Sequence, residues 1–246
     1  MNDTKTFLLI HGAWEGAWSW KHTTTYLEQK GHEVVAIDLP GHGTNKTPIA
    51  EITLQSYADC VKEELGSLGK PVILVGHSFA GFINVVVAEQ APENIEKLIF
   101  VASALPYAGK TAVQVFEEDE ESEFLQNLIF SEDKSSATMS RETIQNIVFN
   151  GANDAQLDFV LPQLVEQAIQ PFFEPVITTG ANYGRLPKAY VETTKDRVLS
   201  LKGQRHVQKM NGIDEIITLE LGHVPLETGP AELASALDTL SKPHHK

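Results

Sequence analysis

Short apolar runs alternate with amphipathic stretches along the first hundred residues of the chain. Four runs have the aliphatic character of strands buried on both faces, at residues 6–10, 33–37, 72–75 and 97–102. Between them, three stretches carry apolar residues at helical spacing, at residues 18–30, 54–68 and 79–90. This alternation predicts an α/β fold, in which right-handed crossovers join parallel strands and helices cover both faces of the sheet.

The alternation breaks after the fourth strand. Residues 104–186 show mostly helical periodicity, and the acidic run at 117–123 within them is expected to be a solvated helix face. Alternation then resumes, with strands at 188–192 and 215–219 and helices at 199–209 and 230–240. We therefore expect one domain over residues 1–246, with about six mostly parallel strands and a helical cap inserted at 104–186.

Composition and charge narrow the classes of partner. The chain has 246 residues and a formal net charge of −14, which disfavours nucleic acid and anionic membrane surfaces. Cys60 is the single cysteine, and the chain has neither a signal-peptide core nor an apolar run of about 20 residues. These features predict a cytoplasmic protein that acts on a small molecule without membrane or nucleic-acid partners.

A serine lies where the third apolar run ends, in the sequence VGHSFAG. A strand, the pattern G-x-S-x-G and a helix together form a nucleophile elbow, in which small residues allow a tight, strained turn. Ser78 occupies the nucleophile position, and Ala80 replaces the second glycine of the pattern. The alternative role for Ser78 is an N-cap of the following helix, but the preceding strand favours a nucleophile.

A serine nucleophile needs a base and an acid, which follow it in this fold in the order serine, acid, histidine. His223 and Asp196 both lie in loops after predicted strands, at the same sheet edge as the elbow. His206 falls within a predicted helix, Asp214 precedes its strand, and Glu192 ends a strand. We therefore expect Ser78, His223 and Asp196 to act together, although Asp196 is also in position to cap a helix.

An oxyanion hole requires two backbone N–H groups. Phe79 follows the nucleophile, and Ala13 lies in the sequence HGAW after the first strand. His11 and His77 are expected to hold these loops in place without a catalytic role, and His42 is expected to be a turn residue. Histidine spacing typical of a metal site and phosphate-binding glycine motifs are both lacking, so we expect no metal and no cofactor.

These motifs together carry a family resemblance over the whole chain. The segments HGAWEGAWSW, DLPGHG, VGHSFAG, KAYVETTKDRVL and LGHVPLE resemble the α/β-hydrolase superfamily. Within it, they are similar to the plant methylesterases and hydroxynitrile lyases and to their bacterial esterase and pyrethroid-hydrolase relatives. The resemblance implies a triad of Ser78, Asp196 and His223, a six-stranded core, a helical cap and a homodimer.

Two positions favour ester hydrolysis within this group. The lyases carry threonine and lysine where this chain has Gly12 and Val224, and valine cannot supply the charge that suits cyanide release. We expect a serine carboxylesterase for a small to medium, neutral, hydrophobic ester. A hydroxynitrile lyase, a lactone-cleaving enzyme and a non-catalytic ligand receptor are the alternatives. The expected substrate-binding residues are Gly12, Trp14, Phe124, Leu128, Phe159, Phe172 and Val224, with Leu161 and Phe173 as further candidates for the pocket wall.

Overall fold

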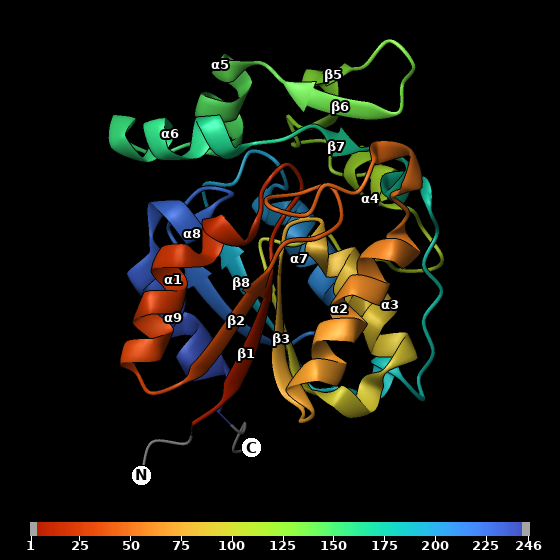
Figure 1. Cartoon of the computed structure of the whole chain (residues 1–246), viewed down its shortest axis with the longest axis vertical. Coiled ribbons are helices and arrows are strands. Elements are labelled where there is room, and N and C mark those ends of the chain that lie inside the picture. The colour runs from red at the N-terminus through yellow and green to blue at the C-terminus, as the bar shows by residue number, and fades with distance from the viewer. Residues whose placement is uncertain (1–3, 243–246) are drawn as a thin grey trace.

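A six-stranded parallel sheet forms the centre of the protein, in a computed structural model that describes residues 4–242 (Figure 1). Its strands lie in the order β2-β1-β3-β4-β8-β9. In chain order they are β1 (Thr6–Ile10), β2 (Glu33–Ile37), β3 (Val72–His77), β4 (Ile95–Val101), β8 (Lys188–Thr193) and β9 (Glu215–Leu219). The predicted fold class is confirmed, and the prediction for residues 1–3 and 243–246 falls outside the described part.

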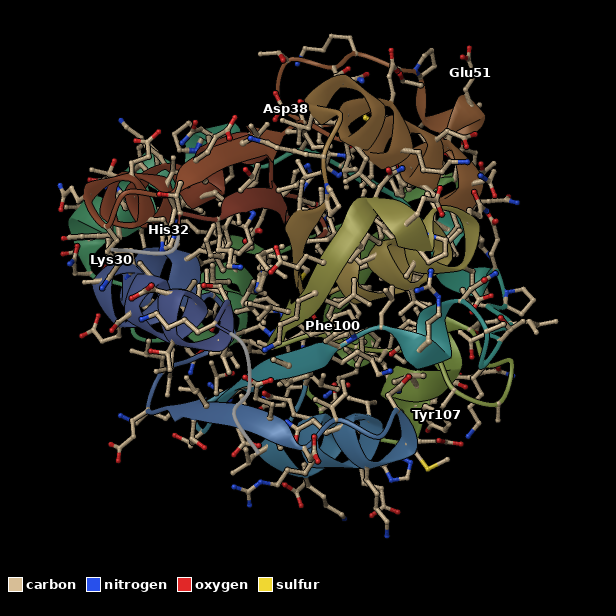
Figure 2. The ribbon with its side chains drawn as sticks, turned by 90° about the horizontal axis from the view of Figure 1, so that it is seen from below. Lys30, His32, Asp38, Glu51, Phe100 and Tyr107 are labelled. Carbon is tan, nitrogen blue, oxygen red and sulfur yellow. The ribbon has the colours of Figure 1, made fainter. Side chains whose placement is uncertain are left out.

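Helices cover both faces of this sheet (Figure 1). One face carries α1 (Lys21–Gln29), α8 (Pro225–Thr228) and α9 (Pro230–Leu240), and the other carries α2 (Leu54–Leu68), α3 (Ala80–Gln90) and α7 (Leu201–Met210). Alternate residues of each strand point to opposite faces, so Leu8 joins one apolar core and Phe7 the other. Phe100 of β4 is fully buried near the middle of the molecule (Figure 2).

The helix boundaries follow local capping chemistry. Thr53 and Ser56 form a capping box at the start of α2, and Gly69 ends this helix with a φ of +62°. The helix predicted at 18–30 is divided into a 3-10 turn (Ala17–Trp20) and α1. Within residues 4–242, no helix is long and apolar enough to cross a membrane.

The segment between β4 and β8 differs from its predicted helical character. Besides α4 (Ala112–Glu117), α5 (Arg141–Thr143), a π-helix (Ile144–Val148) and α6 (Asp154–Val160), it contains a three-stranded antiparallel sheet. The strands of this sheet are β5 (Leu128–Phe130), β6 (Ser136–Met139) and β7 (Gln167–Ala168). Strands of two to four residues are too short to show alternation, which explains why the sequence pattern missed them. Most of the segment lies above one end of the central sheet, and residues 174–187 run down beside α3 (Figure 1).

The acidic run at 117–123 is not a helix face, because α4 ends at Glu117. Asp119 is buried, and its carboxylate accepts hydrogen bonds from the backbone N–H (2.7 Å) and the hydroxyl (2.6 Å) of Ser200. Ser200 in turn is the N-cap of α7. One acid of the run therefore joins the segment above the sheet to a helix of the main domain.

Candidate active site

Ser78 lies on a sharp turn between β3 and α3. Its φ of +53° is in the left-handed region, which strains a residue that carries a side chain. A Cβ atom at Gly76 would lie 2.6 Å from Nδ2 of Asn84, and one at Gly81 would lie 2.4 Å from the carbonyl oxygen of Ala104. The close packing around this turn therefore depends on both glycines.

Three side chains from separate loops form a hydrogen-bonded relay at this turn. Nε2 of His223 lies 2.9 Å from Oγ of Ser78, and Nδ1 of His223 lies 2.8 Å from Oδ2 of Asp196. An ionised carboxylate only accepts, so Nδ1 donates to Asp196 and Nε2 is left to accept the hydroxyl proton of Ser78. All three residues are buried. This arrangement is suited to moving a proton from the serine to the imidazole.

Backbone and side-chain donors fix the carboxylate of Asp196. Its Oδ1 accepts the N–H groups of Val198 (2.8 Å) and Leu199 (2.9 Å). Its Oδ2, which faces His223, also accepts the hydroxyl of Thr193 at 3.2 Å. These bonds hold the carboxylate in place and orient one oxygen toward the imidazole.

Glu192 and His206, the rival acid and base, are not part of the relay. His206 is on α7, where its ring packs against Tyr107. Glu192 forms an ion pair with Arg205 at 2.9 Å and accepts from Thr218. Neither side chain contributes to the relay.

The loop after β1 approaches the turn closely at Gly12. A Cβ atom there would lie 2.7 Å from Nδ1 of His77 and 3.2 Å from Cβ of Ser78, so a threonine would displace one of them. The Gly12 N–H donates to Oε2 of Glu15 at 3.0 Å. Ala13 and Phe79, the expected oxyanion-hole residues, line one small cavity together with Ser78. The loop and the elbow thus meet around the serine hydroxyl.

His77 and Glu15 form a buried ion pair beside this cavity. Nδ1 of His77 donates to Oε2 of Glu15 (3.1 Å), and Nε2 donates to the backbone carbonyl of His223 (2.8 Å). Both partners accept, so both ring nitrogens carry protons and the ring is an imidazolium. Burial lowers the pKa of His77, but the charge of Glu15 and its hydrogen bond outweigh burial and hold the pKa above its ordinary value. Burial likewise raises the pKa of Glu15, but the charge of His77 prevails and the pKa is lowered.

His11 is a neutral support of the same loop. Its Nε2 accepts the N–H of Leu39 at 3.1 Å, and its Nδ1 donates to the carbonyl of Gly12 at 2.7 Å. Burial, followed by the charge of His42, lowers the pKa of His11 to about 3. The side chain therefore positions the loop through hydrogen bonds and carries no charge at neutral pH.

Trp14 joins this loop to the segment above the sheet. Its indole N–H donates to the carbonyl of Ala137 at 2.8 Å, and its backbone N–H donates to Oε1 of Gln167 at 3.2 Å. The Trp14 carbonyl accepts the N–H of Val165 at 3.1 Å. The φ of Trp14 is +64°, a strained value that these three bonds maintain.

The expected wall residues divide into two groups. Trp14, Phe124 and Phe172 line the small cavity with Ser78, and Leu128 lines a neighbouring cavity. Three predictions are corrected, because Phe159, Leu161 and Val224 line neither cavity. Their side chains belong to the apolar cluster on the face of the sheet that carries α1 and α9. Phe159 packs edge-to-face on Trp18, with ring centroids 5.9 Å apart. Local sequence does not reveal which face a residue reaches after several turns, so these aromatic and aliphatic positions could not be sorted from their order alone.

Sequence reasoning missed three supporting residues. Glu15 lies within the quoted HGAWEGAW motif, where a charged residue among small and apolar ones was the available signal. Gln167 is buried and also donates to the hydroxyl of Tyr57 at 2.9 Å. Asn150 donates to the carbonyl of Lys195 at 2.7 Å and accepts the N–H of His223 at 3.4 Å. The last two have no local motif, since their partners are distant in sequence.

The comparisons with known proteins define the class. Residues 7–236 match the alpha/beta hydrolase family, and the chain belongs to this family. The family resemblance expected from the motifs is therefore confirmed.

Among the described residues, no cluster of three or more histidine, cysteine, aspartate or glutamate side chains could hold a metal ion.

Several relatives are plant proteins. The chain is 26% identical to methylesterase 9 of Arabidopsis thaliana, over 95% of this chain and 96% of that protein. It is 28% identical to norfluorocurarine synthase 1 of a Strychnos species, over 96% and 95% of the two chains. A chloroplastic methylesterase-like protein of Arabidopsis thaliana, number 13, is 28% identical, and the match covers 98% of this chain but 57% of that protein.

Solved structures share the fold. Polyneuridine aldehyde esterase, as its H244A variant, superposes with a TM-score of 0.88 at 23% identity, covering 98% of this chain and 100% of that one. The pyrethroid hydrolase PytH superposes with a TM-score of 0.81 at 24% identity, covering 97% of each chain. At these identities the likeness shows the fold alone.

Proposed function

We propose that this protein is a cofactor-independent serine carboxylesterase. The observation that carries the proposal is the relay in which Nε2 of His223 lies 2.9 Å from Oγ of Ser78 while Asp196 holds Nδ1. This is the geometry by which a general base activates a serine hydroxyl. The methylesterases among the relatives support ester hydrolysis as the reaction class.

The reaction would proceed in two halves. In the first, His223 takes the proton of Ser78 as Oγ bonds to the ester carbonyl carbon. The resulting oxyanion is stabilised by the N–H groups of Ala13 and Phe79. The carbon–oxygen bond to the alcohol then breaks, and His223 returns the proton to the leaving alkoxide. Asp196 stays ionised and stabilises the imidazolium.

In the second half, water replaces the alcohol. His223 takes a proton from water as its oxygen attacks the acyl-enzyme carbonyl. The bond to Oγ breaks, the carboxylic acid leaves, and Ser78 regains its proton from His223. No step needs an external oxidant, reductant or metal.

The lining of the small cavity favours hydrolysis over cyanide chemistry. Its described lining residues include no lysine, and Val224, where the lyases carry lysine, faces a different apolar cluster. A threonine at position 12 would collide with His77 or Ser78. These observations disfavour the lyase alternative for the same relay.

The test combines labelling with turnover. We expect a phosphonofluoridate to modify Ser78 covalently and the wild-type protein to hydrolyse p-nitrophenyl acetate. The Ser78→Ala variant should lose labelling and at least about 1,000-fold in kcat. Full hydrolysis by Ser78→Ala would refute the mechanism, and labelling without turnover of esters or lactones would favour a receptor. Cyanohydrin cleavage measured beside ester hydrolysis would identify a lyase.

A further inference from the structure

Two cavities adjoin at the relay. The first, which we call the inner chamber, has a volume of about 20 Å³ and contains Ser78 and His223 among its lining residues. The second, which we call the outer chamber, has a volume of about 180 Å³ and is lined by Trp14 and by residues of the segment above the sheet. The outer-chamber residues are Trp14, Val113, Phe124, Leu125, Leu128, Phe130, Ala137, Gln167, Ile169, Phe172 and Phe173.

Three aromatic side chains separate the two chambers, because Trp14, Phe124 and Phe172 line both. The ring centroid of Trp14 lies 5.7 Å from that of Phe124 and 6.4 Å from that of Phe172. Phe172 also stacks on Phe79, with centroids 3.9 Å apart and planes within 10°. The wall therefore touches the residue whose N–H is proposed to bind the oxyanion.

The inner chamber is too small to hold an ester. A volume of about 20 Å³ accommodates roughly one water-sized group. An ester bound for attack on its carbonyl by Ser78 must therefore extend beyond this chamber. The outer chamber is the adjoining space across the aromatic wall.

The outer chamber suits a neutral apolar group. Gln167 is the one lining residue with an amide side chain, and none of the described lining residues is charged. The Gln167 amide already binds the backbone N–H of Trp14, the ring of His42 and the hydroxyl of Tyr57. A charged group in this chamber would therefore lose its hydration without gaining a partner.

Hydrogen bonding distinguishes the three rings of the wall. The Trp14 indole is held by its hydrogen bond to Ala137, whereas phenylalanine rings are held by packing alone. Phe172 lies in a 3-10 turn (Gln170–Phe173) whose next residue, Phe173, is 56% exposed. Rotation of the Phe124 and Phe172 rings would join the chambers while Trp14 and the loop after β1 stay in place.

We propose that the outer chamber binds the hydrophobic half of the ester, an alkyl or aryl group of medium length. The Phe124 and Phe172 rings open to admit it while Trp14 remains anchored. This inference rests on the proposed esterase function and names its substrate class. Substrates with only short groups on both sides of the carbonyl leave the outer chamber unused and react more slowly.

The kinetic test uses two isomeric esters and one short ester. Hydrolysis of methyl hexanoate, pentyl acetate and methyl acetate is followed by titration of the released acid. The Leu128→Trp variant fills the outer chamber, and we expect it to lower kcat/KM for at least one isomer, relative to methyl acetate, by about 10-fold or more. A loss for methyl hexanoate places the acyl chain in the chamber, and a loss for pentyl acetate places the alcohol there.

The matched control is Ile129→Trp, which adds the same side chain at a neighbouring position. Ile129 is 51% exposed and does not line either chamber, so its selectivity should equal that of the wild type. Val113→Phe fills the outer chamber from another element and provides a second variant if Leu128→Trp does not fold. Unchanged selectivity in the folded chamber variants would overturn the proposal.

A binding experiment separates this inference from the esterase proposal. Crystals of Ser78→Ala soaked with methyl hexanoate or pentyl acetate should show the apolar chain in the outer chamber, past the Phe172 ring. This readout does not depend on turnover. A chain found elsewhere would exclude the chamber even if the wild type hydrolyses esters, whereas an occupied chamber without turnover would remove only the esterase function.

Discussion

The Nε2–H group of His77 donates to the backbone carbonyl of His223 at 2.8 Å. The residue that precedes the candidate nucleophile thus holds the main chain of its candidate base. The other ring nitrogen of His77 is bound by Glu15, which also accepts the N–H of Gly12. One buried ion pair therefore connects the loop after β1, the elbow and the loop that carries His223.

Removing the charge of Glu15 should weaken both the fold and the reaction. Glu15→Gln leaves the His77 imidazolium buried without a counter-charge. The pKa of His77 therefore falls, and Nδ1 of His77 loses its proton more readily. We expect a loss of about 3 kcal/mol in the free energy of unfolding. We also expect about a 10-fold lower kcat at similar KM, because the His223 loop is less well positioned.

Denaturant unfolding and the pH profile of kcat measure these effects. The pH profile should acquire a new limb from His77 in Glu15→Gln, which a purely structural role would not produce. The control is Glu28→Gln, which removes the same charge from an exposed position on α1. Identical pH profiles for Glu15→Gln and the wild type would contradict the positioning role.

The buried carboxyl group of Glu227 predicts that the protein is less stable in alkaline solution. Glu227 on α8 is 2% exposed, and its Oε1 has no hydrogen-bond partner among the described residues. Burial, followed by repulsion from Glu15, raises the pKa of Glu227 from 4.5 to about 8, against a smaller opposing effect of Lys21. The folded state favours the protonated acid, so this stabilisation is complete below pH 4.5 and is lost as the pH rises through 8.

Glu227→Gln should remove this loss. At pH 9 we expect the variant to melt about 2–4 °C above the wild type, which corresponds to roughly 1 kcal/mol, while the two agree more closely at pH 5. Thermal unfolding monitored by circular dichroism at both values checks this. Glu232→Gln, at an exposed position of α9, is the control and should follow the wild type. If the difference in melting temperature between Glu227→Gln and the wild type were the same at pH 5 and pH 9, the raised pKa would be ruled out.

Asn150 connects the loops that carry Asp196 and His223. Its side chain donates to the carbonyl of Lys195 and accepts the N–H of His223, at 2.7 and 3.4 Å. We expect Asn150→Ala to lower kcat by about 10-fold with little change in KM, because the relay loses alignment while the chambers keep their lining. Steady-state kinetics with methyl hexanoate measure the two constants. Asn146→Ala, at an exposed neighbouring position, should behave as the wild type, and a rise in KM alone would argue against alignment.

Substitutions at two adjacent positions of the elbow, Ala80 and Gly81, should differ in their effect on stability. A Cβ at Gly81 would lie 2.4 Å from the backbone oxygen of Ala104, which cannot move as a side chain can. We expect Gly81→Ala to destabilise the protein by about 2 kcal/mol and to reduce turnover strongly, since the strain falls beside Ser78. Ala80→Gly restores the G-x-S-x-G pattern and should cost about 1 kcal/mol at most. Chemical unfolding of both variants tests the comparison, and equal stabilities would disprove it.

The local elements of this protein could be predicted because their signals are local. The aliphatic runs identified all six strands of the main sheet, and 230–240 was predicted with the bounds of α9. The elbow was recognisable because a strand, a small-residue turn and a helix follow one another without interruption. Ser78, His223 and Asp196 could be proposed together because parallel strands bring their following loops to one edge.

The three short strands and the sorting of wall residues depend on distant contacts. Ala137 of β6 pairs with Gln167 of β7, thirty positions later, and no periodic pattern in the sequence indicates such a pair. Phe159 and Phe172 are similar in type and near in sequence, yet only Phe172 reaches the chambers. The difference lies in how the segment folds back over the sheet.

The sequence by itself therefore determined the sheet, the elbow and the chemical types of the relay, since each depends on hydrophobic period, turn sterics and chain order. Only the tertiary structure decided that Glu15 pairs with His77 and that Trp14 separates two chambers. Such contacts join residues up to about 150 positions apart, as Trp14 and Gln167 show. They arise because buried polar groups must find partners and apolar rings must fill space, and packing of the whole chain selects which ones meet.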